Sequence, residues 1–426
     1  MSEPVPSSRT GPAGPAGILW GRAVSWAFYD FANTIYSALV VSFAVALHVK
    51  RYTGVEKYTY LTIGLSLLAS GLLLPFAGEV ADRTGRPRRY LGWLTLLTCA
   101  CCAAMAFADG AWLILALFFV ANFSYNSSLT FYDSLLPTLG PPERLGTVSG
   151  LGVGLGYAGV AFALPIGWGV LRTCENLPPR RELAPLFALA GVLFLLFSLP
   201  LFLYVPEKPA TKRTRPGAPV FRLAYSRVLT TLRLLPRHKP LLLFLLGNFF
   251  MVDSLNTGIV AAAPYMVHVF GLPHREAMLW LIPFSLGAGV LGVLGGRLVD
   301  AFGPRRIMLL AGFCVMAALV LGALAGSFAL FIVAFVLLGG FGLANIWVAG
   351  RRLLLELVPP GQVGKYFGLY NVGHKLSMIG PVAFGLLADL KIPSIPAGGY
   401  RLGLLCQIPL LVVGLLLIRA VRTDDD

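Results

Sequence analysis

Polar and ionisable side chains interrupt four long apolar runs of this chain, and they are the first candidates for chemistry. An ionisable group in the middle of a bilayer costs about 2.5–3.5 kcal/mol, so each one needs a partner or a function. Within each run the polar residues recur at helical spacing, which places them on one helix face. The four stripes are Asp30, Asn33 and Thr34; Asn122, Tyr125 and Asn126; Asp253, Asn256 and Thr257; and Asn371, His374 and Lys375.

The polar groups of four narrow stripes can all find hydrogen-bond partners if the stripes line one water-filled cavity. Asp30, Asp253 and Lys375 would give this cavity one net negative charge with His374 neutral. A zwitterion would fit, with its ammonium beside an aspartate and its carboxylate beside Lys375. A proton would fit as well, because a desolvated carboxylate binds protons more tightly. Two alternatives stay open: the amides and hydroxyls could hydrogen-bond between helices in a dry bundle, and Lys375 could pair with one aspartate.

Two loops with similar sequences carry a second set of charges. Residues 78–89 read GEVADRTGRPRR and residues 295–306 read GGRLVDAFGPRR, so that Asp82 and Asp300 are 218 positions apart. A carboxylate at a helix end can cap the positive N-terminus of a neighbouring helix, and for Asp82 we expect the helix that starts at Gly364 and Lys365. Asp133 is expected to receive one of the arginines. We predict a cytoplasmic gate that consists of Asp82, Arg83, Arg86, Asp133, Asp300, Arg305 and Arg351.

The elements that must position these residues are membrane-spanning helices. Hydrophobic residues make up 57% of the chain and charged residues only 12%, against about 25% charged in a soluble domain. Apolar runs of roughly 20 residues, which is enough to span a bilayer, predict twelve transmembrane helices. They lie near 20–47, 59–80, 90–108, 111–135, 147–171, 184–204, 241–263, 277–299, 307–326, 328–350, 366–388 and 402–420.

The repeat divides these helices into two halves. The offset of 218 also carries Pro141, Gly146 and Gly150 onto Pro359, Gly364 and Gly368. A half-chain repeat in an apolar protein is typical of a two-lobed transporter with its site between the lobes. We therefore predict an all-α polytopic membrane protein with twelve transmembrane helices in two pseudo-symmetric six-helix bundles.

The domain boundaries follow from the same pattern. We predict a disordered N-terminus (1–17), an N-terminal bundle (18–204), a basic linker (205–240), a C-terminal bundle (241–420) and a short tail (421–426). Residues 220–235 of the linker have apolar positions at helical spacing. They predict an amphipathic helix against anionic lipid headgroups, with a solvated basic linker as the alternative.

The distribution of charge indicates orientation rather than nucleic-acid binding, despite a net charge of +15. With the N-terminus inside, 23 of the 34 Lys and Arg residues fall in cytoplasmic segments and nine outside, which fits the positive-inside rule. Both termini are therefore expected in the cytoplasm. The cysteines are scattered and do not indicate a metal or cofactor site. The sequence shows no nucleophile accompanied by a base and an orienting group, so it does not indicate an enzyme. PPGQVGKYFG (359–368) lacks the spacing of a phosphate-binding loop.

These residues resemble the major facilitator superfamily over nearly the whole chain, with GEVADRTGRPRR similar to its loop between helices 2 and 3. Five segments resemble its vacuole-effluxer branch, which includes an autophagy-related fungal amino-acid exporter. They are WAFYDFANT (26–34), FYDSLLP (131–137), GTVSGLGVGLGYAG (146–159), FMVDSLNT (250–257) and KYFGLYNVGHKLSMIGP (365–381). The chain departs from the branch at Ser254, where glycine is usual, and Ala301 replaces the arginine of the first loop.

The resemblance implies alternating access and proton-coupled or facilitated movement of a small solute. We expect a monomeric secondary transporter of the bacterial inner membrane that moves a small polar solute, such as an amino acid or related zwitterion, with export favoured. The alternatives are a lipid, amphiphile or drug translocase of the same fold, and a membrane sensor that lost transport.

Overall fold

The computed structural model describes residues 17–55, 57–174, 183–207, 220–359, 361–377, 379–388, 390, 395 and 397–422. In the N-terminal half these residues form α1 (Trp20–Tyr36), the π-helical η1 (Ser37–Ala44), α2 (Val45–Thr53), α3 (Lys57–Thr84), α4 (Pro87–Phe107), α5 (Ala111–Ser134), α6 (Leu145–Cys174) and α7 (Ala184–Tyr204). Helix α8 (Val220–Leu234) belongs to the linker. Most of the predicted disordered N-terminus (1–16), part of the linker (208–219) and the end of the tail (423–426) lie outside the described residues.

The C-terminal half repeats this arrangement. It contains α9 (Lys239–Phe270), α10 (His274–Phe302), α11 (Pro304–Leu324), α12 (Phe328–Val333), the π-helical η5 (Ala334–Gly339), α13 (Gly340–Leu357), α14 (Val363–Leu376), α15 (Ile379–Ala388), α16 (Gly398–Leu405) and α17 (Gln407–Arg419). Short 3-10 turns η2 (Leu136–Thr138), η3 (Pro142–Arg144) and η4 (Leu235–Arg237) connect helices.

Eleven continuous helical stretches in the described residues are long and apolar enough to cross a membrane. The twelfth crossing consists of α14 and α15, which are separated at Ser377. The prediction of one continuous helix over 366–388 is therefore wrong. Ser377 has ψ of 83°, outside the helical range, and α15 starts anew two residues later. Broken helices are tolerated in membranes where protein groups satisfy the freed backbone, and Asp253 does so here.

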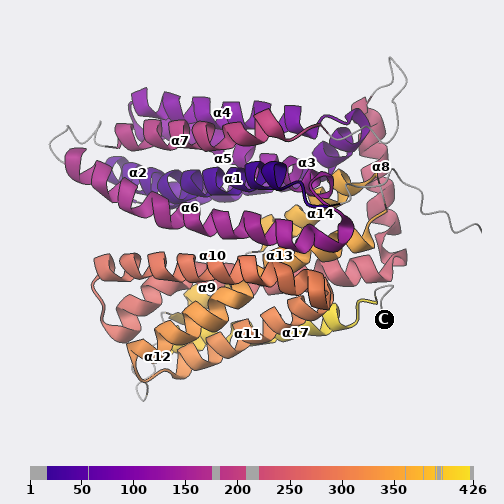
Figure 1. The fold of residues 1–426 in the computed structure, drawn as a ribbon. Helices are drawn as coiled ribbons and strands as arrows, with labels where there is room; N and C mark the ends of the chain where they lie inside the picture. The colour runs from indigo at the N-terminus through magenta and orange to yellow at the C-terminus, as the bar shows by residue number, and fades with distance from the viewer. Residues whose placement is uncertain are drawn as a thin grey trace, which may run out of the picture.

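Each half has its own hydrophobic core. One cluster of buried side chains extends from Ala23 to Val205, and the other is almost wholly built from residues between Leu241 and Val421. Figure 1 shows the two halves as two helical layers, α1 to α7 above and α9 to α17 below, with α14 reaching up beside α3. The predicted two-bundle architecture is confirmed, because each half buries its own apolar faces.

The two halves meet along pairs of helices that approach through glycine. Gly146, Gly150 and Gly154 follow one face of α6 and contact the backbone of α10, where a Cβ on Gly150 would stand 2.6 Å from the Gly292 carbonyl oxygen. On the other side, Gly78 of α3 faces Gly364 of α14. Small residues allow backbones in a membrane to pack this closely.

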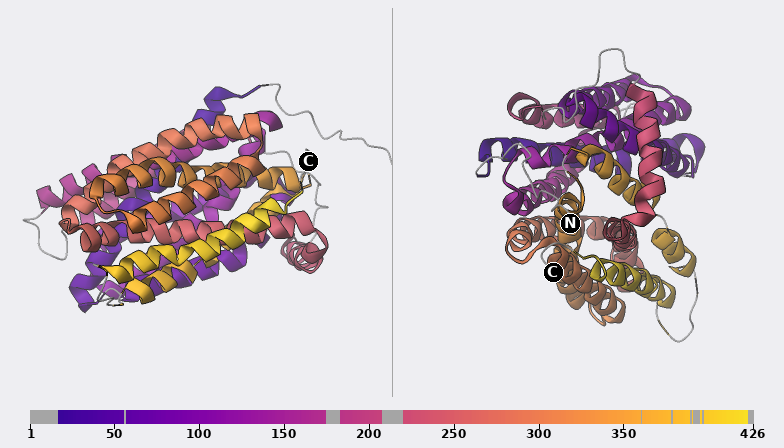
Figure 2. Two further views of the ribbon diagram at one scale, coloured as in Figure 1. Left: turned by 90° about the horizontal axis from the view of Figure 1, so that it is seen from below. Right: turned by 90° about the vertical axis from the view of Figure 1, so that its right-hand side faces the viewer.

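Helix α8 crosses between the halves at one end of the molecule, which we call the linker end (Figure 2). Tyr225 stacks on Phe76 of α3 with ring centroids 5.5 Å apart, and Thr231 accepts a hydrogen bond from the Lys365 ammonium of α14 at 2.9 Å. Val228 is buried and Arg233 is exposed. The helix that the linker sequence predicts thus packs on both halves.

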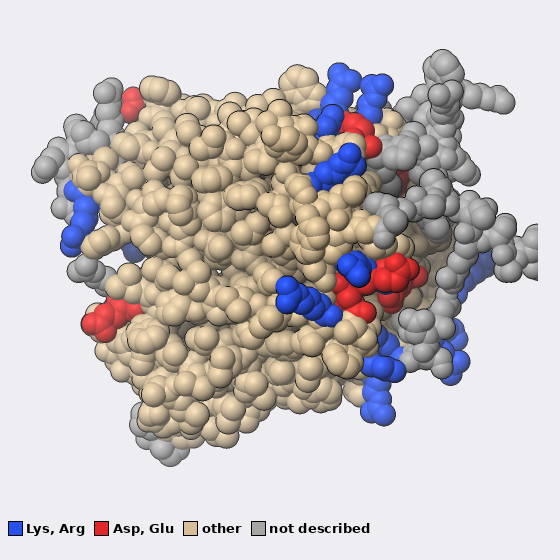
Figure 3. Space-filling view, in the orientation of Figure 1, with Lys and Arg blue, Asp and Glu red and all other residues tan. Residues whose placement is uncertain are grey.

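Charged side chains lie near the two ends of the visible face in Figure 3, with a broad uncharged band between them. Large exposed apolar side chains such as Leu72, Trp93 and Phe313 occur on the spanning helices. Apolar side chains that face outward over most of a helical bundle are expected for a protein surrounded by lipid.

Candidate functional site

The central feature between the halves is a buried charge network. Arg351 of α13 places Nη1 3.4 Å from Asp30 Oδ2 of α1 and Nε 3.0 Å from Asp133 Oδ1 of α5. Asn371 of α14 donates a hydrogen bond to Asp133 Oδ2 at 3.1 Å, and Asn33 donates one to Asp30 Oδ1 at 3.0 Å. Two helices from each half therefore converge on one network, which we call the interlobe charge network (Asp30, Asp133, Arg351, Asn371).

Arg351 and Asp133 are equivalent positions of the repeat, 218 residues apart. Two equivalent positions that touch each other must lie close to the axis that relates the two halves. The salt bridge between them is thus near the pseudo-twofold axis that relates the two halves.

An aromatic wall borders the network in the N-terminal half. Trp26 and Tyr132 stack with ring centroids 4.3 Å apart and planes at 5°. The Arg351 guanidinium carbon lies 5.9 Å from the Trp26 ring and 5.7 Å from the Tyr132 ring. These contacts lie within the range of cation–π attraction, and they supplement the two carboxylates as partners of a buried cation.

Arg351 corrects the predicted gate. The sequence places it at the cytoplasmic end of a helix, but the structure buries its side chain against Asp30 and Asp133. Asp133 does receive an arginine, although not one from the loops. Arg83 pairs with Glu79 one turn away at 2.9 Å, and Arg86 is exposed.

Three predicted cavity residues instead make contacts within one half. Asn122 donates to Ser66 of α3 at 2.7 Å, and Asn126 donates to Asn122 Oδ1 at 3.0 Å, with both residues buried. His374 accepts a hydrogen bond from Asn248 at 2.8 Å, and its ring lies against Trp347 and Tyr370. For Asn122 the dry-bundle alternative matches the observed contact, because Ser66 of the neighbouring helix α3 supplies the partner.

Four other candidates are only partly buried: Thr34, Tyr125, Asn256 and Lys375. Thr34 donates a hydrogen bond to the Asp30 carbonyl at 2.6 Å, and Tyr125 packs on Tyr36. Asp133 is the carboxylate that acts electrostatically on Lys375. Within the described part of the chain, no salt bridge joins Lys375 to an aspartate, so the contact of the alternative in which Lys375 pairs with one aspartate is not formed in this structure.

Asp253 lies apart from the interlobe charge network and caps the second half of the broken helix. Its Oδ1 accepts a hydrogen bond from the Ser377 hydroxyl at 3.0 Å, and its Oδ2 accepts one from the Gly380 N–H at 2.5 Å. A carboxylate at the N-terminus of α15 interacts favourably with the helix dipole. Asp30 and Asp253, which match in the repeat, thus have different partners.

The loop aspartates form two matching contacts at the linker end. Asp82 accepts hydrogen bonds from the N–H groups of Gly364 and Lys365 at 2.9 and 3.0 Å, which is the contact that the sequence predicts. Asp300 accepts bonds from the N–H groups of Gly146 and Thr147, both at 2.7 Å. The offset of 218 relates these two sets, so each half caps a helix of the other.

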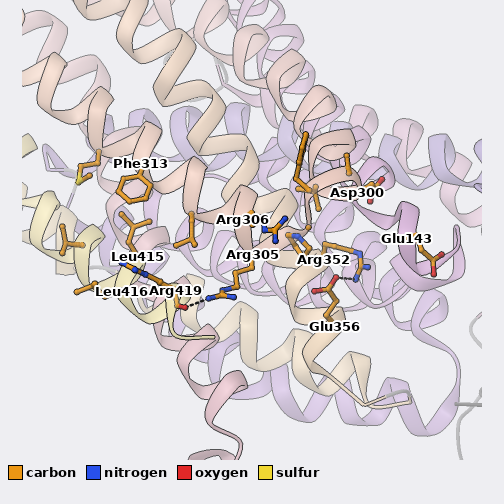
Figure 4. A pocket seen from close by; sticks show the side chains of 18 residues that line it. Glu143, Asp300, Arg305, Arg306, Phe313, Arg352, Glu356, Leu415, Leu416 and Arg419 are labelled. Atoms are coloured by element: carbon orange, nitrogen blue, oxygen red, sulfur yellow. Dashed lines mark hydrogen bonds and ion pairs between the residues drawn. The ribbon is translucent and has the colours of Figure 1, made fainter. Parts of the chain in front are cut away.

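Glycine permits the turns that follow these aspartates. Gly85 and Gly303 have φ of 65° and 85°, in the left-handed region that other residues rarely adopt. After the second turn, Arg305 donates to the carbonyl oxygen of Arg419 at the end of α17. Asp300 and Arg305 line a pocket of about 850 Å³ at this end of the C-terminal half (Figure 4).

Replacing Asp82 with asparagine is expected to loosen the first turn of α14. The loss of a charged N-cap costs about 1 kcal/mol, so amide hydrogen exchange at Gly364 and Lys365 should become roughly fivefold faster. Hydrogen-exchange mass spectrometry of the peptide around 361–368 measures this change. Glu143→Gln, on the exposed surface, is the control, and equal exchange in both variants would contradict a capping role for Asp82.

Two buried polar residues between the helices were not predicted from the sequence. Thr130, which accepts from Asn371 at 3.2 Å, lies outside the predicted stripe of α5. Gln407 lies fully buried at the start of α17, and a lone amide in the apolar run 402–420 was a signal for it. Among the described residues, no group of three His, Cys, Asp or Glu side chains could hold a metal ion.

Comparison with protein-family models identifies the family to which a chain of this architecture belongs. The family model described as Major Facilitator Superfamily matches residues 18–259. The chain belongs to this superfamily. The model described as vacuole effluxer Atg22 like matches residues 142–425, so this facilitator belongs to that branch as well.

Individual relatives agree with this placement. The facilitator is 26% identical to an uncharacterized MFS-type transporter of Bacillus subtilis, over 94% of each chain. It is 27% identical to an autophagy-related protein 22-2 of Aspergillus clavatus, over 57% of this chain and 43% of that protein. It is 22% identical to a multi-drug resistance efflux pump homologue of Lactococcus lactis, over 87% of this chain and 89% of that one.

Solved structures share the fold. The human organic anion transporter MFSD10 superposes with a TM-score of 0.73 at 18% identity, over 93% of this chain and 99% of that one. The proton:xylose symporter XylE superposes with a TM-score of 0.68 at 14% identity, over 95% and 96%. The protein is therefore an integral membrane protein of a transporter family.

Proposed function

We propose that this protein is a secondary active transporter that moves a small polar solute by alternating access. The observation that carries the proposal is the interlobe charge network, because charges buried between two halves are costly unless they have a function. Asp82 and Asp300 hold the linker end closed in this conformation. Release of these contacts would open the same end.

The proposed solute carries a carboxylate, as an amino acid or a related zwitterion does. Lys375 is partly exposed and has no salt bridge among the described residues, and Asp133 acts on it from the interlobe charge network. A ligand carboxylate would therefore bind Lys375, and a ligand ammonium would bind an aspartate of the network. The efflux and autophagy-related relatives support export, and coupling to protons is part of the proposal.

The linker end is proposed to face the cytoplasm of a bacterial cell, with both termini there and α8 beside anionic lipid headgroups. The excess of Lys and Arg in the segments assigned to this side supports the orientation. Accessibility of a single cysteine introduced at Arg237, which is exposed after α8, to a membrane-impermeant reagent in intact cells tests it. Labelling in intact cells would contradict the orientation.

Thermal unfolding of purified protein against amino acids, peptides, organic cations and sugars would identify ligands, which are then tested for uptake into proteoliposomes. Ligand binding stabilises the folded state, and the stabilisation grows with the logarithm of the ligand concentration divided by its Kd. A complete lack of transport for every stabilising ligand would contradict the proposal and favour a sensor.

Replacing Lys375 with methionine is expected to weaken binding of carboxylate-bearing solutes by at least tenfold and to spare purely cationic ones. A charged hydrogen bond contributes about 1.5–3 kcal/mol, which corresponds to roughly 10- to 100-fold in affinity. Titration of the ligands found in the thermal screen measures the change. An equal loss for cations and zwitterions would show that Lys375 supports the fold rather than the solute.

A further inference from the structure

A pocket of about 850 Å³ opens at the linker end of the C-terminal half, where α11 begins and α17 ends. Figure 4 shows Arg305 and Arg306 near its centre, between two sides of different character. One side is mostly apolar and consists of Phe313, Leu415, Leu416 and Arg419. The pocket therefore joins positive charge to apolar surface.

The acidic side chains of the lining lie on the other side of the pocket, away from Arg419 (Figure 4), and are Glu143, Asp300 and Glu356. Asp300 accepts hydrogen bonds from the start of α6, and Glu356 pairs with Arg352 at 3.0 Å. Arg306 and Arg419 are exposed, and among the described residues neither guanidinium group takes part in an ion pair or a hydrogen bond. These two guanidinium groups are thus open to an anion.

Apolar side chains follow Arg306 along one face of α11. Leu309, Phe313 and Met316 line the pocket three, seven and ten positions after it, which is helical spacing. At 1.5 Å per residue this face extends about 15 Å from the charged end toward the middle of the helix. Phe313 is 54% exposed, so the face is open toward the surrounding lipid.

Helix α17 provides a matching face that leads to its own charged end. Leu416 and Val412 line the pocket three and seven positions before Arg419, and Leu416 is 59% exposed. The two helices touch between these faces, because a Cβ on Gly312 of α11 would stand 2.6 Å from Leu415 of α17. The result is a groove with arginines at its end and apolar walls along its length.

The internal repeat indicates which kind of group fits the start of α11. At the start of α4, the Glu207 carboxylate accepts hydrogen bonds from the N–H groups of Arg88 and Arg89, both at 3.1 Å. Arg306 is the repeat equivalent of Arg88, at the offset of 218. In the described part of the chain, no side chain caps the N-terminus of α11 and no acid lies in its first turn. The C-terminal half thus leaves open a position that an anion occupies in the N-terminal half, where the helix dipole favours negative charge.

We propose that this groove binds one anionic phospholipid, with its phosphate on Arg306 and Arg419 and its acyl chains along Phe313 and Leu416. Arginine matches phosphate with paired, charge-assisted hydrogen bonds. Basic pockets between membrane helices bind anionic headgroups. A soluble phosphate would contact the arginines alone, whereas a lipid contacts both the arginines and the apolar walls. The inference goes beyond the proposed function and does not depend on transport.

Lipid binding to the purified full chain in detergent tests the inference. Native mass spectrometry compares phosphatidylglycerol with phosphatidylcholine of the same acyl chains. We expect one phosphatidylglycerol to bind at least tenfold more tightly than phosphatidylcholine, and the thermal unfolding midpoint to rise by a few degrees and saturate. In Arg306→Gln with Arg419→Gln this preference should disappear, and both side chains are exposed, so the variant should fold as the wild type does.

Arg86→Gln with Arg89→Gln is the matched control. It removes the same charge from two exposed arginines of the first loop, and the preference for phosphatidylglycerol should remain. An equal loss of preference in both double variants would show general attraction to a positive surface and would overturn the inference. A preference that persists in Arg306→Gln with Arg419→Gln would overturn it as well.

Two other occupants are outcomes of the same measurements. Glycerol 3-phosphate offers a phosphate without acyl chains, and stabilisation equal to that by phosphatidylglycerol would assign the pocket to a soluble anion. Asp425, the repeat equivalent of Glu207, lies outside the described residues. If Asp425→Asn lowers the lipid-free midpoint as much as Arg306→Gln with Arg419→Gln does, and phosphatidylglycerol is not preferred, the pocket belongs to the chain itself. Either outcome would overturn the lipid site and leave the proposed transport untouched.

Discussion

Replacing Arg351 with glutamine is expected to produce the largest loss of stability and activity of any single change at the interlobe charge network. Arg351 is buried and lies within ion-pair distance of both Asp30 and Asp133. Removing one partner of a buried ion pair leaves uncompensated charge and costs about 3–5 kcal/mol. We expect a sharply lower unfolding midpoint in detergent and solute transport at background level.

Two further variants separate charge from shape. In Arg351→Gln with Asp30→Asn and Asp133→Asn, both unpaired carboxylates are also removed, so the unfolding midpoint should largely recover while transport stays absent. Arg352→Gln is the matched control on the same helix, since Arg352 is partly exposed and pairs with Glu356 at 3.0 Å one turn away. Such a pair contributes about 0–1 kcal/mol. Equal effects of Arg351→Gln and Arg352→Gln would contradict a central role for the network.

Replacing Gly78 with alanine is expected to prevent closure of the linker end. A Cβ at this position would stand within van der Waals overlap of the Gly364 carbonyl oxygen and carbon in α14. Both opposing groups are backbone and cannot turn aside, so α3 and α14 must move apart and the Asp82 hydrogen bonds must stretch. We expect transport to fall by more than tenfold, because alternating access needs both the open and the closed state.

The position of α14 over α3 can be read from a reporter cysteine. Leu74→Cys is suitable because Leu74 is buried beneath α14. In Gly78→Ala its alkylation should be at least tenfold faster. Gly64→Ala is the matched control on the same helix, since nothing lies within 4 Å of its added Cβ and both changes raise helix propensity alike. Equal alkylation in the two variants would show that close approach at Gly78 is not required for closure.

The amino-acid sequence predicted features whose cause is local or repeated. Apolar runs predicted the spanning helices, because the bilayer requires a set length of apolar helix. The offset of 218 paired Asp82 with Asp300, and charge at a helix end was enough to predict that Asp82 would contact Gly364 and Lys365. The spanning helices and the Asp82 contact both follow from short-range physical rules, which the repeat applies to each half.

Residue partners across the bundle were decided by the tertiary structure alone. The stripe of Asn122 and Asn126 has the same period whether it faces a cavity or a neighbouring helix, and Ser66 and the backbone of α5 supply the observed partners. The break at Ser377 was not predicted, because polar residues such as His374 and Lys375 before it fit a helix face as well as a helix end. It depends on Asp253, 124 positions away in the chain.

Arg351 shows both what the sequence determined and what the tertiary structure decided. By itself the sequence determined that a cation lies near a helix end and that its repeat equivalent is Asp133. Only the packing of the halves decided that the two equivalent residues touch, since helix periodicity defines a face but not the helix opposite it. Burial between lobes then made this pair, rather than the loop arginines, the central ion pair of the candidate site.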